Sequence, residues 1–334
     1  MNPRTRGFKV NAPFLSIMGK RDSRADILND DPFSNRSSSR IHRVHQGSDR
    51  SNSHAQRAQF SEALGQFFGQ IHMNQKPKHH KGKLWHFSDV EKQHLRLAMG
   101  AFTLALGFMA VGGLSGIRSY GMSTWLVLLV ISMPVMFIAI GPAFLFHEIG
   151  HKLVAKRNGC WAEFRADPKG LQFGIVLSLL LGFLFMAPGA VMVAGLVTRR
   201  QNGHIAVAGP LTNLGLFLIG IPLWGIILGL SGAFEYTPDL AKDAPRYLLD
   251  GSLVWQAMLV DAGVYWLGAN LILGLFNMLP FGPLDGLKVK DWSDGAFFTV
   301  IGVFALLVFT MFTGVWSPTV VLETIAEPVS NLIR

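Results

Sequence analysis

The chain has 334 residues, of which half are hydrophobic and only 15% are charged, and its mean hydropathy is +0.33. This is the composition of a membrane protein rather than of a soluble one. The charge is unevenly distributed: residues 1–96 carry 17 Lys and Arg against 8 Asp and Glu, whereas residues 97–334 carry 13 of each. The single cysteine, Cys160, excludes an intramolecular disulfide bond.

Residues 1–95 are predicted to be a basic, largely disordered tail. Residues 1–58 are rich in Ser, Asn, Arg, His and Asp, and their scattered apolar side chains cannot bury enough surface to offset the cost of ordering. Apolar residues then recur at helical spacing and predict a short amphipathic helix over 60–72. With the basic run 76–83 this helix suits an anionic lipid surface, although a solvated basic linker explains the same residues.

Beyond the tail, apolar segments predict an all-α polytopic membrane protein with about five to six transmembrane helices. Five of them are long enough to cross a bilayer of about 30 Å. A sixth, 171–197, is apolar but is interrupted by Pro188-Gly189. The five long segments are 97–117, 124–147, 205–230, 256–279 and 296–316.

The distribution of charges predicts the path of the chain through the bilayer. Basic segments favour the cytoplasmic side, which places the tail and the loop 152–169 inside. If 171–197 enters the membrane and returns, Arg199 and Arg200 also lie inside, and the acidic loop 231–255 lies outside. We therefore expect a re-entrant segment or hairpin near 171–197, which protein or a wet cavity must cover.

The run His147-Glu148-Ile149-Gly150-His151 ends an apolar segment that has no charge between Trp125 and Phe146. On a helix, the HExxH spacing places two imidazoles one turn apart on one face, so that both can bind one zinc ion. The Glu then lies where it can take a proton from a water on the metal. Ionisable groups are costly at the edge of a bilayer, so a functional role is the default interpretation.

A catalytic zinc site usually has a third protein ligand. Asp285 is the leading candidate, because it follows two prolines at the end of an apolar segment, where a broken helix can turn a carboxylate inward. The predicted topology brings this end to the same side of the membrane as His147. Asp261 is a weaker candidate, since it lies near the outer end of the same segment.

The two motifs together resemble the site-2 protease family of intramembrane zinc metalloproteases. That family pairs HExxH with an NxxPxxPLDG motif, which matches Asn277-Met278-Leu279-Pro280-Phe281-Gly282-Pro283-Leu284-Asp285-Gly286. The run Ala208-Gly209-Pro210-Leu211-Thr212-Asn213 also resembles the GPxxN element of the family. The resemblance covers about 125–290.

The resemblance implies that His147, His151 and Asp285 bind one Zn²⁺ ion per site and that Glu148 activates the attacking water. Asn213 and Asn277 match positions that line the active site in the family, where they orient the substrate or support the ligands. Pro188-Gly189-Ala190-Val191 resembles a membrane-dipping hairpin whose edge can add an extended substrate strand. For Asn213 and Gly209, close helix packing is an equal alternative.

We therefore predict that residues 96–334 form a transmembrane zinc metalloprotease domain with its catalytic core at about 124–290. The expected enzyme is an intramembrane endopeptidase of the cell membrane, multi-pass with a cytoplasmic N-terminus. It would act on membrane proteins that have a transmembrane helix, within the lipid bilayer and with no nucleic-acid partner. The alternatives are a catalytically silent zinc-binding adaptor, against which the intact Glu148 argues, and a transporter, for which no internal repeat is found.

Overall fold

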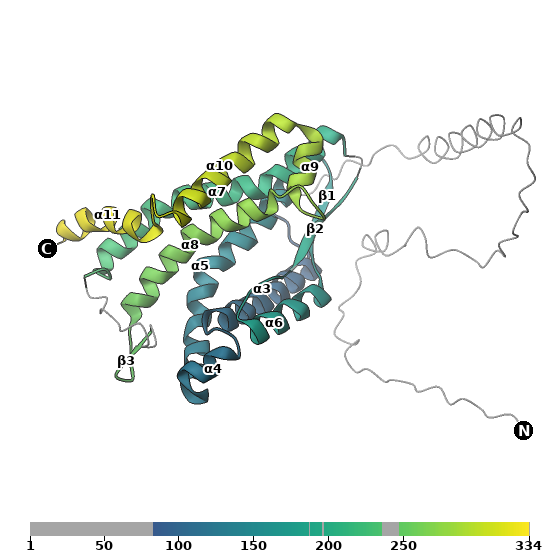
Figure 1. The fold of residues 1–334 in the computed structure, drawn as a ribbon. Coiled ribbons are helices and arrows are strands. Elements are labelled where there is room, and N and C mark those ends of the chain that lie inside the picture. Colours follow the sequence, from purple (N-terminus) through teal and green to yellow (C-terminus); the bar gives the residue numbers. More distant parts are fainter. Residues whose placement is uncertain (1–82, 187, 196, 236–246, 334) are drawn as a thin grey trace, which may run out of the picture. The chain divides into compact units, whose positions relative to one another are not determined.

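The described part of the chain is built mainly of long helices, and the predicted site residues lie on them or directly after them (Figure 1). The computed structural model describes residues 83–186, 188–195, 197–235 and 247–333, all within one compact unit that extends from Pro77 to Arg334. The predicted tail up to residue 82, including the amphipathic helix 60–72, lies outside the described residues.

Four described helices are long and apolar enough to cross a membrane, which confirms the all-α polytopic class. The apolar part of each helix coincides with one of the predicted segments to within a few residues. Their outer faces expose large apolar side chains such as Val130, Leu218 and Phe309, as a lipid-facing surface requires. The four helices are α5 (Met122–Arg157), α7 (Arg199–Ser231), α8 (Trp255–Asn277) and α10 (Asp294–Phe312).

The first predicted segment, 97–117, becomes two helices. α3 (Asp89–Ala110) runs antiparallel to α5, and the chain turns at Gly112 and Gly113, both with positive φ, before the short α4 (Ser115–Tyr120). α3 is less apolar than the four long helices, because its first two turns carry charged residues. The expected boundary between tail and catalytic domain at 95/96 falls inside this helix.

The segment 171–197 runs away from β1 as a helix and returns to β1 as a strand. α6 (Pro168–Leu181) is a 14-residue apolar helix of about 21 Å, too short to cross the hydrocarbon core. The chain then comes back as β2 (Gly189–Ala194), which pairs antiparallel with β1 (Trp161–Ala166). The backbone N–H of Asp167 donates to the carbonyl of Pro188 at 3.2 Å and closes the hairpin. This geometry is the re-entrant form that the charge distribution predicts.

The remaining elements lie at the ends of the long helices. A small hairpin, β3 (Leu248–Leu249) and β4 (Ser252–Leu253), precedes α8. The short α9 (Asp285–Trp292) follows α8 and packs against α7. α11 (Pro318–Asn331), which the sequence did not predict, packs along α7 and α8.

The largest apolar core lies among α5, α7, α8 and α10 (Figure 1). It includes fully buried Leu267, Leu271, Met278 and Phe304. A second cluster joins α3, α5 and β1 through Phe102, Phe144 and Phe164. The C-terminal end of α5 is thereby packed between two groups of elements, with α7, α8 and α9 in one and α3 with the β1–β2 pair in the other.

Candidate metal centre

The last turns of α5 place His147 and His151 on one buried face. They are four residues apart on a regular helix, so their imidazoles are neighbours. Their Nε2 atoms lie 3.0 Å apart, and the rings meet edge to face with centroids at 4.6 Å. Both side chains are buried, which removes them from competition with water.

The first residue of α9, Asp285, brings a carboxylate to the same point. Its Oδ2 lies 3.4 Å from His147 Nε2 and 3.0 Å from His151 Nε2. Gly286 makes the approach possible, since a Cβ atom there would lie 2.0 Å from the carbonyl oxygen of Met278 at the end of α8. The ends of α5 and α8 therefore meet, as the predicted topology requires.

Hydrogen bonds fix the tautomer of each imidazole. The Asn213 amide nitrogen donates to the Ala143 carbonyl and to Asn270 Oδ1, each at 3.0 Å, so its Oδ1 is left to accept from His147 Nδ1 at 2.6 Å. His151 Nδ1 donates to the carbonyl of Ile205 at 2.7 Å. Each ring thus carries its proton on Nδ1 and directs an unprotonated Nε2 toward Asp285.

Three electron-pair donors that converge on one point are suited to hold a cation between them. The ligand atoms of His147, His151 and Asp285 all lie within 4.8 Å of one another. Donors at 2.0–2.1 Å from a tetrahedral zinc lie about 3.3 Å apart, which is close to the distances here. The group therefore fits zinc by chemistry and by spacing.

α7 makes room for the ligands at Gly209. A Cβ atom at this position would lie 2.4 Å from His151 Nε2 and 2.6 Å from His147 Cε1. Gly150 likewise allows α5 to approach α7, since its Cβ would meet Thr212 Oγ1 at 2.4 Å. The small residues thus serve close packing, and at Gly209 this packing directly shapes the ligand site.

Glu148 lies between the metal ligands and the sheet. It is partly buried, and the backbone N–H of Val191 in β2 is close enough to interact with its carboxylate. Lys288 Nζ approaches the other oxygen of Asp285, Oδ1, at 3.4 Å. The Glu148 carboxylate, the strand β2 and the candidate metal ligands therefore lie next to one another.

Other sequence candidates have different surroundings. The amide of Asn277 donates to the Leu273 carbonyl of its own helix at 2.9 Å, and no contact joins it to the ligands among the described residues. Asp261 accepts from Tyr247 Oη at 2.9 Å. Cys160 lies in a buried apolar cluster, where burial raises the pKa of its thiol.

Sequence reasoning missed Asn270, whose Oδ1 fixes the amide of Asn213. It also missed the Ile205 carbonyl that orients His151. Asn270 did give a signal, because an amide within an apolar crossing is uncommon and usually has a partner. A backbone carbonyl gives none.

Together, the helices and the buried His-His-Asp group beside a glutamate define a membrane metallopeptidase. Residues 135–291 match peptidase family M50. A candidate zinc metalloprotease of Methanocaldococcus jannaschii is 38% identical over 160 residues, which are 48% of this chain and 70% of that protein. The chain belongs to this family, which is the site-2 protease family that the two motifs predict.

Two further relatives agree with this assignment. A candidate zinc metalloprotease of Bacillus subtilis is 28% identical over 167 residues, covering 48% of this chain and 68% of that protein. A chloroplast protein of Arabidopsis thaliana, also named as a zinc metalloprotease, is 27% identical over 178 residues, 48% of this chain and 30% of its own. No solved structure matches the chain. The protein is therefore a membrane-associated zinc protease.

Proposed function

We propose that the chain is an intramembrane zinc endopeptidase that cleaves membrane proteins within or near a transmembrane helix. The observation that supports this most is the convergence of His147, His151 and Asp285 at the ends of apolar helices. A metal-dependent hydrolase built in this way meets its substrate at the membrane edge. A transmembrane segment that is locally unwound fits this location.

The residues have separate roles in the proposed reaction. His147, His151 and Asp285 would hold the metal, and zinc bound there would supply Lewis-acid activation of the water and of the peptide carbonyl. Glu148 accepts the proton of the attacking water and passes it to the leaving amine. Asn213 keeps His147 in the tautomer that binds metal. Asn277 remains a candidate for substrate contact at the end of α8.

β2 offers a way to present the substrate. It pairs with β1 on one edge, and in the described part of the chain its other edge has no strand partner. Because the N–H of Val191 faces Glu148, that free edge lies beside the proposed base. A substrate helix hides its amides in its own hydrogen bonds, so it must unwind to an extended form before hydrolysis, and an extended segment can add to this edge.

The proposed placement puts the metal near the cytoplasmic face of the cell membrane. The tail and the basic residues at the end of α5 lie inside, and the loop between α7 and α8 lies outside. The cleavage products would then be released toward the cytoplasm. This distinguishes the proposed enzyme from a secreted zinc protease.

The direct test uses full-length protein in liposomes with single-span membrane proteins as substrates. Glu148→Gln should keep one zinc per chain and lower cleavage by about 10²- to 10⁴-fold, the usual contribution of a general base. His147→Ala combined with His151→Ala should lose the zinc. Fragments that accumulate with the active enzyme and not with Glu148→Gln would identify natural substrates. Wild-type protein that binds zinc without cleaving any membrane substrate would instead indicate the adaptor alternative.

A further inference from the structure

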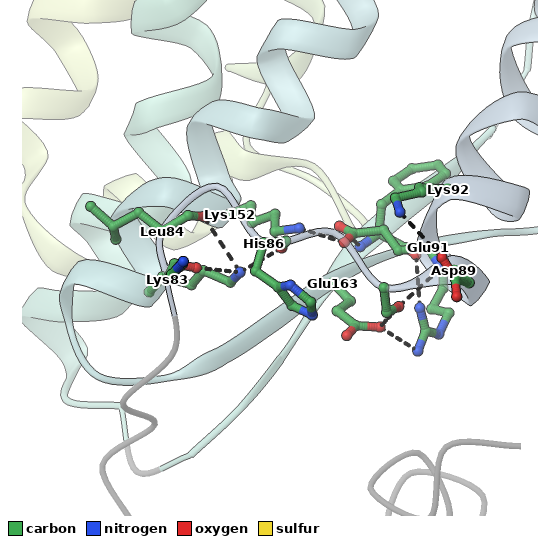
Figure 2. Close-up of polar contacts among 12 residues, drawn as sticks. Lys83, Leu84, His86, Asp89, Glu91, Lys92, Lys152 and Glu163 are labelled. Carbon is green, nitrogen blue, oxygen red and sulfur yellow. Dashed lines mark hydrogen bonds and ion pairs between the residues drawn. The ribbon is translucent and has the colours of Figure 1, made fainter.

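A buried ion pair links the start of α3 to the residue that follows the last histidine of the motif. Lys152 Nζ donates to Glu91 Oε2, and the two side chains are almost fully enclosed, with 1% and 0% of the residue surface exposed (Figure 2). The ammonium also lies 3.5 Å from the centroid of the Phe87 ring. Two charges without water are retained only where each is well paired, so this contact is built rather than incidental.

Lys152 belongs to the second face of α5. It follows His151 by one residue, a rotation of about 100° about the helix axis, so it points away from the metal ligands. Lys156, one turn later, shares this face and donates to the carbonyls of Lys83, Leu84 and His86 at 3.3, 3.4 and 2.8 Å. One face of the helix end therefore carries the ligands, and the other holds the segment 83–91 (Figure 2).

Glu91 uses its second oxygen for the sheet. Oε1 accepts the backbone N–H of Phe164 in β1 at 3.0 Å. One carboxylate thus bridges α5 and β1. Since β1 pairs with β2, and the Val191 N–H of β2 faces Glu148, the bridge extends from the zinc-binding helix to the strand beside the proposed base.

The bridge is itself held in place. Ser88 Oγ caps α3 by accepting the backbone N–H of Glu91 at 3.1 Å, and it donates to Glu163 Oε2 at 2.9 Å. Arg165 pairs with the same Glu163 carboxylate at 2.8 Å. Glu91 is therefore fixed in backbone and side chain, with neighbours on α3, α5 and β1.

We propose that Glu91 is a positioning residue for the proteolytic site: it sets the distance between the β1–β2 pair and the HExxH end of α5. The inference rests on the proposed function, since an extended substrate on β2 must place its carbonyl between Glu148 and the metal. A small displacement of the strand then reduces the chemical step more than it reduces binding.

Two substitutions separate positioning from charge balance. Glu91→Asp keeps both charges and shortens the bridge by one methylene, so that it can reach Lys152 or Phe164 but not both. Glu91→Gln combined with Lys152→Met removes both charges but keeps the length of both side chains, so the Gln still accepts Phe164 N–H, packs against the Met and retains the spacing between α5 and β1. The matched control is Asp89→Asn combined with Lys92→Met, which neutralises an exposed pair of the same segment, with Nζ and Oδ1 at 3.2 Å.

The experiment measures kcat, KM, zinc content and amide hydrogen exchange over residues 161–166 in full-length protein in liposomes. We expect Glu91→Asp to keep one zinc per chain, to exchange the Phe164 amide at least tenfold faster and to lower kcat at least tenfold, with KM within threefold. The Gln/Met variant should retain kcat within threefold of wild type, as should the control. The proposal would be overturned if Glu91→Asp kept the wild-type kcat and the wild-type protection of the Phe164 amide. It would also be overturned if kcat fell as far in the Gln/Met variant as in Glu91→Asp.

The readouts also keep the two proposals apart. If the wild type cleaves nothing, the proposed function fails, while hydrogen exchange over 161–166 and zinc content still report whether Glu91 positions β1. If the wild type cleaves and Glu91→Asp cleaves equally well with unchanged exchange, the positioning role alone fails.

Discussion

Three asparagines near the site differ in what their amides contact, and this predicts three different effects on zinc binding. Asn213 accepts from His147 Nδ1, Asn270 orients Asn213, and Asn277 bonds only its own helix among the described contacts. Groups that orient a metal ligand typically contribute 10- to 100-fold in metal affinity. We expect Asn213→Ala to weaken zinc binding by about this factor, as measured by competition with a chelator, and Asn270→Ala to weaken it less.

Asn277→Ala is the matched control and should leave zinc affinity unchanged. Equal losses in all three variants would mean that the amides act through general helix packing and not through His147. A loss of cleavage in Asn277→Ala at full zinc content would instead support its proposed contact with the substrate.

Gly209 predicts a steric effect at the same ligands. In Gly209→Ala the new methyl would overlap both imidazoles, at 2.4 Å from His151 Nε2. Overpacking of this kind costs about 1–3 kcal/mol, so zinc affinity should fall about 5- to 150-fold. Gly215→Ala is the control on the same helix, since nothing lies within 4 Å of its Cβ position. Tight zinc binding in Gly209→Ala would show that α7 can move away from the histidines at little cost.

At the scale of elements, β1 depends on a histidine of α3. His94 Nδ1 accepts the backbone N–H of Ala166 at 3.0 Å, which only the unprotonated ring nitrogen can do. Burial, and then the nearby Arg165, lower the pKa of His94 below its ordinary value of 6.5. The unfolded chain therefore binds this proton at a higher pH than the folded chain does. Protonation of His94 consequently lowers the free energy of unfolding.

We expect the contribution of His94 to be complete above about pH 6.5 and to be lost as pH falls through the lowered folded pKa. The protection factor of the Ala166 amide, which corrects for the slower intrinsic exchange at lower pH, should fall over this window. His94→Asn keeps an acceptor near the Nδ1 position without titrating, so it should flatten the pH dependence. The exposed His86 is the control, and His86→Asn should leave it unchanged. If the Ala166 amide of His94→Asn loses protection at acid pH as in the wild type, another titrating group causes that loss.

The sequence predicted those elements whose signal is local. An uncharged run of membrane length is sufficient to identify α5, α7, α8 and α10, because in lipid a helix satisfies its own backbone. The break after α3 was not predictable in the same way. Gly113 packs against the end of α6, where a Cβ would lie 2.5 Å from the Leu179 carbonyl, and nothing near Gly113 in sequence indicates this partner.

In the candidate site, too, the residues with a local sequence signal were predicted and those that depend on helix packing were not. The motifs named His147, His151 and Asp285 because their spacing and company are chemical signals. The groups that orient them come from positions more than 50 residues away, as with Asn270 to Asn213 and Ile205 to His151. The bridge from Glu91 to Lys152 spans 61 residues. Such pairs depend on how helices are packed, which charge and hydropathy alone do not determine.

For the whole molecule, the return of the chain between α6 and β2 determines the side on which everything after it lies. With a re-entrant segment, α7 leads outward, α8 returns and brings Asp285 to His147, and α10 leads outward again to α11. A complete crossing would reverse every element from α7 onward. The ligand distances already require that the ends of α5 and α8 meet.

Single cysteines in a Cys160→Ala background test this path, since Cys160 is the one cysteine of the chain. Exposed positions are available at Arg157 after the motif, at Ser252 before α8 and at Asn331 in α11. We expect a membrane-impermeant thiol reagent added to intact cells to label Ser252→Cys and Asn331→Cys, and to label Arg157→Cys only after the membrane is opened. Labelling of 157 and 252 from the same side would mean that 171–197 crosses the bilayer. The histidines and Asp285 would then lie on opposite faces and could not share a metal, so the accessibility of these two residues decides the proposed site as well as the topology.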